Sequence, residues 1–217
     1  MNQLRHIDDR LFFAVNSLAR HTTWLHASVV TYANSGIALF GLLLVAGLLY
    51  ARSRDSRTLG AAGWAGMATL VALAVNQPVS HLFHEPRPYV THTHLLVLVA
   101  RSPDYSFPSD HTVMAGAVAM GLFLTSRRLG LLAAGAGLLM AFARVYVAAH
   151  YPWDVLAGLL LGAAVAGLGW LLLRMPLTTL AAWLRSRPGL SVAFAPTERL
   201  RGTHARVGAA TSADTRA

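Results

Sequence analysis

Long apolar stretches without a formal charge constrain this chain more than any other feature. Residues 28–50 and 58–83 each contain no Asp, Glu, Lys or Arg, and residues 155–173 form a third such stretch. A helix needs about 20 apolar residues to cross roughly 30 Å of hydrocarbon. Stretches of this length and number are typical of membrane proteins rather than of soluble domains. The sequence therefore predicts helices that cross a membrane.

Two shorter apolar segments carry their ionisable residues toward one end. Residues 109–126 contain Asp110 and His111 near their start, and residues 129–147 contain Arg144 near their end. We expect two further crossings here, whose charged ends have a function. The segment before residue 28 instead alternates apolar and charged residues at helical spacing, which predicts a helix in the membrane interface.

The predicted architecture is an all-α integral membrane helical bundle with about five transmembrane helices and an N-terminal interfacial helix. We divide the chain into an interfacial helix over 1–27, a transmembrane domain over 28–174 and a basic tail over 175–217. From residue 188 onward small and polar residues dominate without periodicity, so we expect the tail to be largely disordered. Gly60-x2-Gly63-x2-Gly66, Gly116-x4-Gly121 and Gly158-x3-Gly162 predict close contacts between helices.

The distribution of charge predicts the orientation. The formal charge is +9, and the 18 basic residues are all Arg, scattered between apolar stretches. This pattern fits lipid headgroups better than nucleic acid, which we do not expect as a partner. The Arg residues at 52–57, at 127–128 and after the fifth span fall on one side, which the positive-inside rule assigns to the cytoplasm, as it does the tail. The connection over 84–108 and the segment around His150 then lie on the extracytoplasmic face.

Three clusters of polar residues lie at the outer ends of predicted spans. They are Glu85-Pro86-Arg87-Pro88, Phe107-Pro108-Ser109-Asp110-His111 and Arg144-x5-His150-x3-Asp154. Ionisable residues at this depth are costly and normally face a polar cavity, so we expect one shared site. Guanidinium groups match phosphate oxygens with forked donors and stay charged when buried. The sequence predicts a phosphate ligand.

Local backbone patterns support the same prediction. Pro108 followed by Ser109 marks a helix start, where the amides of Asp110 and His111 would point outward toward an anion. Pro152 fits the first turn of the fifth span, so Asp154 would reach back to His150. The carboxylate would then hold one ring nitrogen as N–H and leave the other as a free nucleophile.

The three clusters resemble the motifs of the type 2 phosphatidic acid phosphatase superfamily. Its signature is K-x6-R-P, then P-S-G-H, then S-R-x5-H-x3-D, and the matching positions run in this order from residue 80 to residue 154. The form Pro-Ser-Asp-His is similar to that of the bacitracin-resistance-type undecaprenyl-diphosphatases of bacteria.

This resemblance implies roles for the matching residues. His150 would attack phosphorus to form a phosphohistidine, Asp154 would orient it, and His111 would protonate the leaving oxygen and later activate water. The residues expected to bind the phosphoryl oxygens are Arg87, Ser109, Asp110 and Arg144. No metal or other cofactor is implied.

The resemblance also implies a substrate and a place in the cell. We expect removal of the terminal phosphate of undecaprenyl diphosphate, a polyprenyl lipid, at the outer face of the bacterial cytoplasmic membrane. This reaction recycles the carrier lipid of envelope synthesis and would confer bacitracin resistance. Alternative substrates are phosphatidate, phosphatidylglycerophosphate and other lipid phosphates. The sequence does not predict the oligomeric state.

Three positions depart from the family pattern. Ser80 stands where the family has Lys, Asp110 replaces the usual Gly, and Ala143 replaces Ser. The candidate substitutes for the missing Lys are His81, His84 and Arg101. The departures concern contacts with the substrate more than the type of reaction.

Other interpretations stay open at this point. The chain could instead be a haem-binding electron carrier or a transporter, because membrane His residues ligate haem and charged clusters line translocation paths. His81, His84, His92 and His94 could be neighbours of lipid headgroups, and Glu85 and Asp104 solvated loop charges. Arg87 and Arg144 could anchor helix ends by snorkelling.

Overall fold

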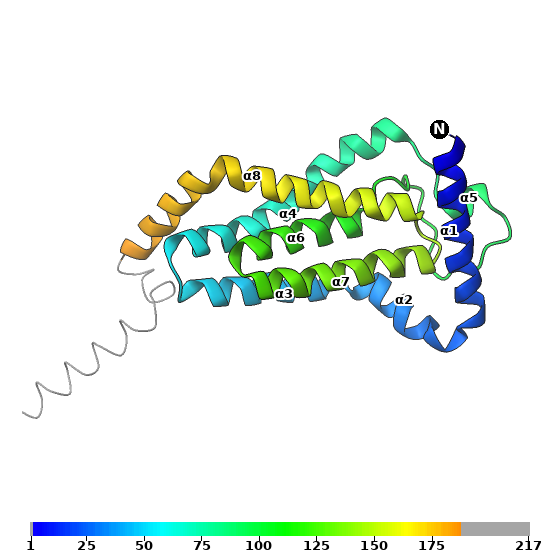
Figure 1. Ribbon diagram of the computed structural model, residues 1–217, viewed down its shortest axis with the longest axis horizontal. Helices are drawn as coiled ribbons and strands as arrows, with labels where there is room; N and C mark the ends of the chain where they lie inside the picture. Colours follow the sequence, from blue (N-terminus) through cyan, green and yellow to red (C-terminus); the bar gives the residue numbers. More distant parts are fainter. Residues whose placement is uncertain (1, 188–217) are drawn as a thin grey trace, which may run out of the picture.

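The computed structural model describes residues 2–187, which form helices joined by short turns and one long loop (Figure 1). The helices are α1 (Asn2–His21), a 3-10 turn η1 (Thr23–Leu25), α2 (His26–Ser35), α3 (Ile37–Arg52), α4 (Ser56–Phe83), α5 (Pro88–Thr91), α6 (Asp110–Thr125), α7 (Arg127–Tyr146) and α8 (Pro152–Ser186). No strand occurs between residues 2 and 187. The predicted all-α class is confirmed.

The long helices lie side by side and define two ends of the molecule. Figure 1 shows α3, α4, α6, α7 and α8 running along the long axis, with α1 lying across one end. The Arg-bearing turns between α3 and α4 and between α6 and α7, and the end of α8, lie at the opposite end. The helices therefore separate the predicted cytoplasmic charges from the connection over 84–108, as the sequence predicts.

A helix occupies each of the five predicted spans, but not all are long enough to cross a membrane. Three segments qualify by length and hydropathy: Ser56–Thr91, Arg127–Tyr146 and Pro152–Ser186. Thr23–Ser35 and Ile37–Arg52 together form a fourth candidate that is bent by 55°. Helix α6 has 16 residues, fewer than a full crossing needs. It is enclosed instead by α4, α7 and α8, which it contacts along its length.

The bend in the first span occurs at Gly36, between α2 and α3. A Cβ atom at Gly36 would lie 2.5 Å from the carbonyl oxygen of Tyr32 and 2.7 Å from Cε of Met140, so a larger residue does not fit. The bend leaves the carbonyl of Ala33 available to a guanidinium nitrogen of Arg144, 3.3 Å away. Broken helices are tolerated in membranes where other groups bond the freed backbone.

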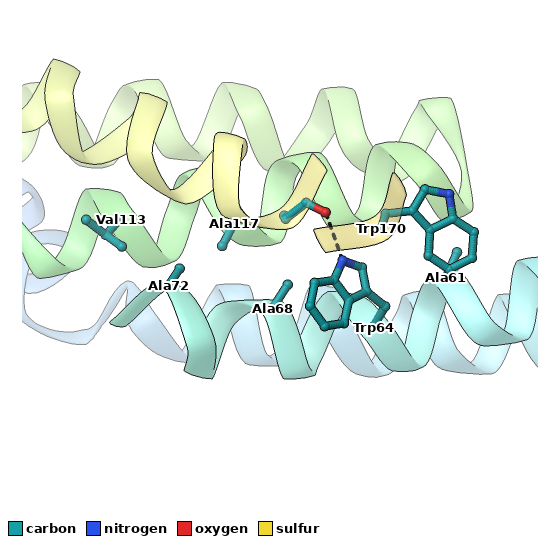
Figure 2. Close-up of a cluster of buried hydrophobic side chains, with 8 residues drawn as sticks. Ala61, Trp64, Ala68, Ala72, Val113, Ala117 and Trp170 are labelled. Carbon is teal, nitrogen blue, oxygen red and sulfur yellow. Dashed lines mark hydrogen bonds between the residues drawn. The ribbon is translucent and has the colours of Figure 1, made fainter. Parts of the chain in front are cut away.

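The central core lies where α4, α6 and α8 meet (Figure 2). It consists largely of small side chains, among them Ala68 and Ala72 of α4 and Ala117 of α6, which allow the helices to approach closely. Trp64 of α4 fills the space beside them and donates its indole N–H to the carbonyl of Ala166 at 2.8 Å. This bond satisfies a polar group that lipid could not.

The predicted glycine contacts are confirmed at five positions and wrong at two. Cβ atoms added at Gly60, Gly116, Gly121, Gly158 or Gly162 would meet backbone atoms of a neighbouring helix or loop. At Gly63 and Gly66 they would meet nothing within 4 Å. These two residues lie on faces of α4 that no other helix covers, which spacing alone does not reveal.

Helix α1 is amphipathic, and its buried face packs against the bundle. Phe12 and Asn16 are buried, whereas Ile7 and Leu11 remain more than half exposed. The amide group of Asn16 donates to the carbonyl of Leu96 at 2.8 Å and accepts from its N–H at 3.2 Å. The contacts explain why α1 lies across the bundle end (Figure 1), and its exposed apolar face agrees with the predicted interfacial position.

Helix α8 continues well past the predicted end of the fifth span. The sequence predicts an end near residue 173 and a largely disordered tail over 175–217, but α8 extends through Pro176 to Ser186. The added turns pack on α4 through Ala181, and the guanidinium of Arg185 donates to the carbonyl of Ala51 at 3.2 Å. Packing of this kind outweighs the one hydrogen bond that Pro176 removes. Residues 188–217 of the predicted tail lie outside the described residues.

Candidate active site

The three predicted clusters meet at the end of the bundle that carries α1. The first follows the end of α4, the second begins α6, and the third joins the end of α7 to the start of α8. They enclose a cavity of about 370 Å³ whose lining includes Arg87, Asp110, His111, Arg144 and His150. The predicted convergence of these residues on one site is therefore observed.

His150 lies at the centre of this arrangement and is 2% exposed. Its Nδ1 is 2.8 Å from the backbone carbonyl oxygen of Ser106. Because a carbonyl only accepts, Nδ1 carries the proton and Nε2 keeps a free lone pair. Nε2 lies 3.3 Å from a guanidinium nitrogen of Arg87 and 3.4 Å from one of Arg144. Burial and the two guanidinium groups hold the pKa of His150 well below its usual value, so the ring is neutral at neutral pH.

Asp154 acts on His150 less directly than the sequence suggested. Its Oδ2 is 3.8 Å from Nδ1, beyond hydrogen-bond distance. It accepts instead from the hydroxyl of Ser106 and, at 2.8 Å, from the backbone N–H of Tyr151. Ser106 thus contacts both partners, the ring through its carbonyl and the carboxylate through its hydroxyl. The direct bond that we predicted between Asp154 and His150 is wrong in its geometry, because Ser106 occupies the place between them.

Arg87 is held from two sides. Its Nε donates to Oδ1 of Asp104 at 3.0 Å, and another nitrogen donates to the carbonyl of Ala149 at 3.1 Å. Asp104 is therefore an ion-pair partner rather than a free loop charge. Burial opposes ionisation of its carboxyl, but a hydrogen bond from Ser102 and the charge of Arg87 together lower its pKa below the usual value. The rigid pairing fixes the planar guanidinium beside His150.

Arg144 is buried with fewer hydrogen-bond partners than Arg87 and, within the described part of the chain, without a carboxylate. It donates to the carbonyl of Ala33, and its Nε is buried without a hydrogen-bond partner. Arg87 and Arg144 are only 7% and 5% exposed and both line the cavity, which rules out snorkelling toward the surface. Asp104 forms an ion pair with Arg87, whereas Arg144 has no carboxylate within ion-pair distance among residues 2–187. An anion in the cavity would pair with Arg144.

The start of α6 presents free amide groups as predicted. Ser109 precedes the helix, its N–H donates to the carbonyl of Asp154 at 3.2 Å, and its carbonyl accepts from Thr112 and Val113. The amides of Asp110 and His111 donate to no acceptor among residues 2–187, which fits an anion-binding helix start. The Ser109 hydroxyl is buried without a partner and lies outside the lining of the cavity.

Asp110 is bound by two amides of α4 that sequence reasoning missed. Its Oδ1 accepts from Nδ2 of Asn76 at 2.7 Å and from Nε2 of Gln77 at 3.4 Å. The available signal was the presence of two adjacent amide residues inside an otherwise apolar span. Ser106 gave no comparable signal, since its contact with His150 is made by the main chain.

The position of the family Lys also lies at this cavity. Ser80 and His81 are part of the lining. His84 instead packs edge-on against Tyr105, with ring centroids 4.7 Å apart, and Arg101 lies over the ring of Tyr89 at 5.7 Å. Of the three candidate substitutes for Lys, only His81 is in the lining.

Comparison with known proteins identifies the family. The model of the PAP2 superfamily matches residues 61–176, a segment that contains all three clusters. The chain belongs to the PAP2 superfamily. Undecaprenyl-diphosphatase BcrC of Bacillus subtilis is 34% identical over 149 residues, which cover 69% of this chain and 75% of that protein. The resemblance inferred from the motifs is confirmed.

Solved structures support the same fold. LpxE of Aquifex aeolicus superposes with a TM-score of 0.57 at 25% identity, covering 73% of this chain and 92% of that one. A transmembrane PAP2-type phosphatidylglycerolphosphate phosphatase from Bacillus subtilis gives 0.55 at 19% identity, covering 77% and 85%. The chain is thus a multi-pass membrane protein with the fold of a PAP2 lipid phosphatase. Family membership favours a phosphatase over the haem-carrier and transporter interpretations.

Proposed function

We propose that this PAP2 phosphatase removes the terminal phosphate of undecaprenyl diphosphate through a phosphohistidine on His150. The observation that carries the proposal is the placement of Nε2, which holds its lone pair beside two buried guanidinium groups in a cavity that also contains His111. A neutral nucleophile with fixed cations around its target is what phosphoryl transfer requires.

In the first step Nε2 attacks the terminal phosphorus. The N–P bond forms as the bond from phosphorus to the bridging oxygen breaks, and undecaprenyl phosphate leaves on that oxygen. His111 gives a proton to the leaving oxygen, while the carbonyl of Ser106 holds the proton on Nδ1 of His150. Arg87, Arg144 and the free amides of α6 stabilise charge on the transferred oxygens.

In the second step water attacks the phosphohistidine. His111, now neutral, takes a proton from the water as the O–P bond forms and the N–P bond breaks, which frees phosphate and returns His150 to its starting state. Each fixed donor aimed at the transferred phosphoryl group contributes about 3 kcal/mol, roughly a hundredfold in rate. Positioning and fixed charge therefore supply most of the acceleration.

The proposed substrate is inferred from proteins of similar sequence. BcrC of Bacillus subtilis is an undecaprenyl-diphosphatase, and its similarity to this chain extends over three quarters of its length. The Pro-Ser-Asp-His form of the second motif supports the same assignment. We propose that hydrolysis at the outer face recycles the carrier lipid of envelope synthesis and confers bacitracin resistance.

Phosphate release by the purified protein tests this function. Undecaprenyl diphosphate, phosphatidate and phosphatidylglycerophosphate are supplied in detergent, separately and in competition, with chelator present. We expect undecaprenyl diphosphate to give the highest kcat/KM. Preference for either monophosphate lipid would replace the proposed substrate, and no release from any of the three would overturn the proposal.

The side of the membrane can be measured because the chain has no Cys. Thr93→Cys places one thiol in the exposed loop before α6, and Ser53→Cys places one in the turn between α3 and α4. A membrane-impermeant maleimide applied to intact cells should label the first variant and not the second. The reverse pattern would put the cavity on the cytoplasmic side.

A further inference from the structure

Asn76 is a buried amide in the second half of α4, and none of the PAP2 motifs includes it. It is 1% exposed and, apart from the adjacent Gln77, its neighbours along this part of the helix are largely apolar. A polar side chain buried in a membrane span is costly unless it has a partner and a function. The bonds that it makes are therefore informative.

Both bonds of Asn76 go to the start of α6. Its Nδ2 donates to the carbonyl of Pro108 at 3.1 Å and to Oδ1 of Asp110 at 2.7 Å. Both partners accept, so the two hydrogens of the amide group are used and its orientation is fixed. The Oδ1 of Asn76 is buried without a partner, so the side chain serves these two bonds alone.

The two bonds hold the chain on either side of Ser109, directly at the free amides of α6. Pro108 comes immediately before the helix start at Ser109, and Asp110 is the first residue of α6. Between and beside them lie the backbone amides expected to bind phosphate and the side chain of His111. Movement of this turn by a fraction of an ångström would displace those donors from the transferred phosphoryl group.

One of the two bonds reaches a departure from the family pattern, and a second departure lies one turn away on α4. Asn76 and Gln77 stand one turn before Ser80, where the family has Lys, so all three positions share a face of α4. Asp110, where the family has Gly, supplies the carboxylate that both amides bind. In this chain α4 contacts the first turn of α6 through an amide–carboxylate pair.

We propose that Asn76 is a positioning residue of the phosphatase reaction, which acts by fixing the first turn of α6 through Asp110 and Pro108. The inference rests on the proposed function for its substrate and adds a residue that the motifs do not contain. Asn76 does not line the cavity, so it touches no substrate.

A double-mutant cycle tests this role with undecaprenyl diphosphate and the purified full chain. The variants are Asn76→Ala, Asp110→Gly and the pair, with Thr69→Ala as a matched control. Thr69 is also a buried polar residue of α4, but its hydroxyl bonds only within its own helix, to the carbonyl of Ala65. Thermal unfolding is followed for each variant.

We expect Asn76→Ala to lower kcat by roughly tenfold to a hundredfold, since a hydrogen bond to a charged group is lost, with little change in KM. In the Asp110→Gly background the same change should have a clearly smaller effect, because one of its two partners is already gone. Thr69→Ala should stay within about threefold of the parent, because the hydroxyl that it removes bonds only within α4. Equal losses for Asn76→Ala and Thr69→Ala, or fully multiplicative effects in the cycle, would overturn the proposal.

A second pair of variants covers the case in which Asn76→Ala does not fold. Asn76→Asp sets two carboxyl groups against each other, and adding Asp110→Asn restores a bond between the two positions with donor and acceptor exchanged. The double variant should be at least tenfold more active than Asn76→Asp, by roughly the strength of one such bond. If it is no more active, Asn76 does not act through Asp110.

A failure of the Asn76 proposal can be distinguished from a failure of the proposed function. If the parent protein releases no phosphate from undecaprenyl diphosphate, the substrate assignment fails, and the cycle is repeated with whichever lipid phosphate it hydrolyses. If the parent is active and the cycle shows no coupling, the substrate assignment stands and the role of Asn76 fails.

Discussion

The carbonyl oxygen of Ser106 lies 2.8 Å from Nδ1 of His150, and the hydroxyl of the same residue donates to Asp154. One serine thus fixes the tautomer of the ring and also positions the carboxylate behind it. The carbonyl bond leaves Nε2 unprotonated and directed toward Arg87 and Arg144. The nucleophile that we propose is oriented by the main chain as much as by the motif carboxylate.

Ser106→Ala separates the two contacts of this serine. The variant keeps the carbonyl and loses the hydroxyl, so Asp154 loses a buried hydrogen bond while Nδ1 keeps its acceptor. We expect kcat to fall by about tenfold, the lower end of the effect of a bond to a charged group. Initial rates of phosphate release measure this, and a rate within twofold of the parent would show that the carbonyl suffices.

Arg87→Lys tests the need for a forked donor. Lys keeps the charge but cannot hold Asp104 and the carbonyl of Ala149 together while facing His150. We expect a loss in kcat of roughly a hundredfold, as for other donors to a transferred phosphoryl group. Arg101→Lys is the matched control, because Arg101 lies over Tyr89 outside the cavity lining, and it should keep the parent rate. Equal rates for the two variants would contradict the role of Arg87.

Asp8 of α1 should make stability depend on pH. Its Oδ1 accepts from the backbone N–H of Trp153, and burial raises the pKa of Asp8 from 3.8 to about 6. A raised pKa means that the ionised form is disfavoured in the folded state, so this group's stability is present below pH 3.8 and is lost as pH rises through 6. Asp8→Asn keeps the acceptor without the charge. We expect its unfolding temperature to exceed that of the parent above pH 6 and the difference to vanish near pH 4; a constant difference would contradict this.

Gly162→Ala tests the close contact between α6 and α8. A Cβ atom there would meet the carbonyl of Val113 and lie 2.7 Å from the backbone nitrogen of Ala117, so the helices would have to separate. We expect a loss of roughly 1–3 kcal/mol in the free energy of unfolding, as for overpacked cores. Gly63→Ala, with nothing within 4 Å, should stabilise α4 by up to about 1 kcal/mol. Denaturation in mixed micelles compares them, and equal stabilities would refute the packing.

The sequence predicted the parts of this molecule that depend on local pattern. Apolar length located the helices, and Pro108 and Pro152 located the starts of α6 and α8. It did not predict that α8 passes Pro176, because contacts with α4 stabilise those turns. The space beside Gly36, where the first span bends, is likewise limited by Met140, which is distant in the sequence.

In the candidate site, too, the sequence predicted what depends on local pattern and not what depends on tertiary contacts. The titratable residues and their convergence followed from motif spacing, since charged groups at one membrane depth need a common polar cavity. The contacts that hold them did not follow. Ser106 acts through a carbonyl that every residue has, and the partner of Asp110 stands 34 positions earlier on another helix. Such contacts depend on tertiary structure alone.

The most direct test of the account is to trap the covalent intermediate. The protein is mixed with undecaprenyl diphosphate carrying radiolabel in its terminal phosphate, quenched in alkali, in which phosphohistidine survives, and analysed by peptide mapping. We expect label on His150 of the parent and neither label nor turnover in His150→Gln. Turnover by His150→Gln, or label on any other residue, would contradict the central claim.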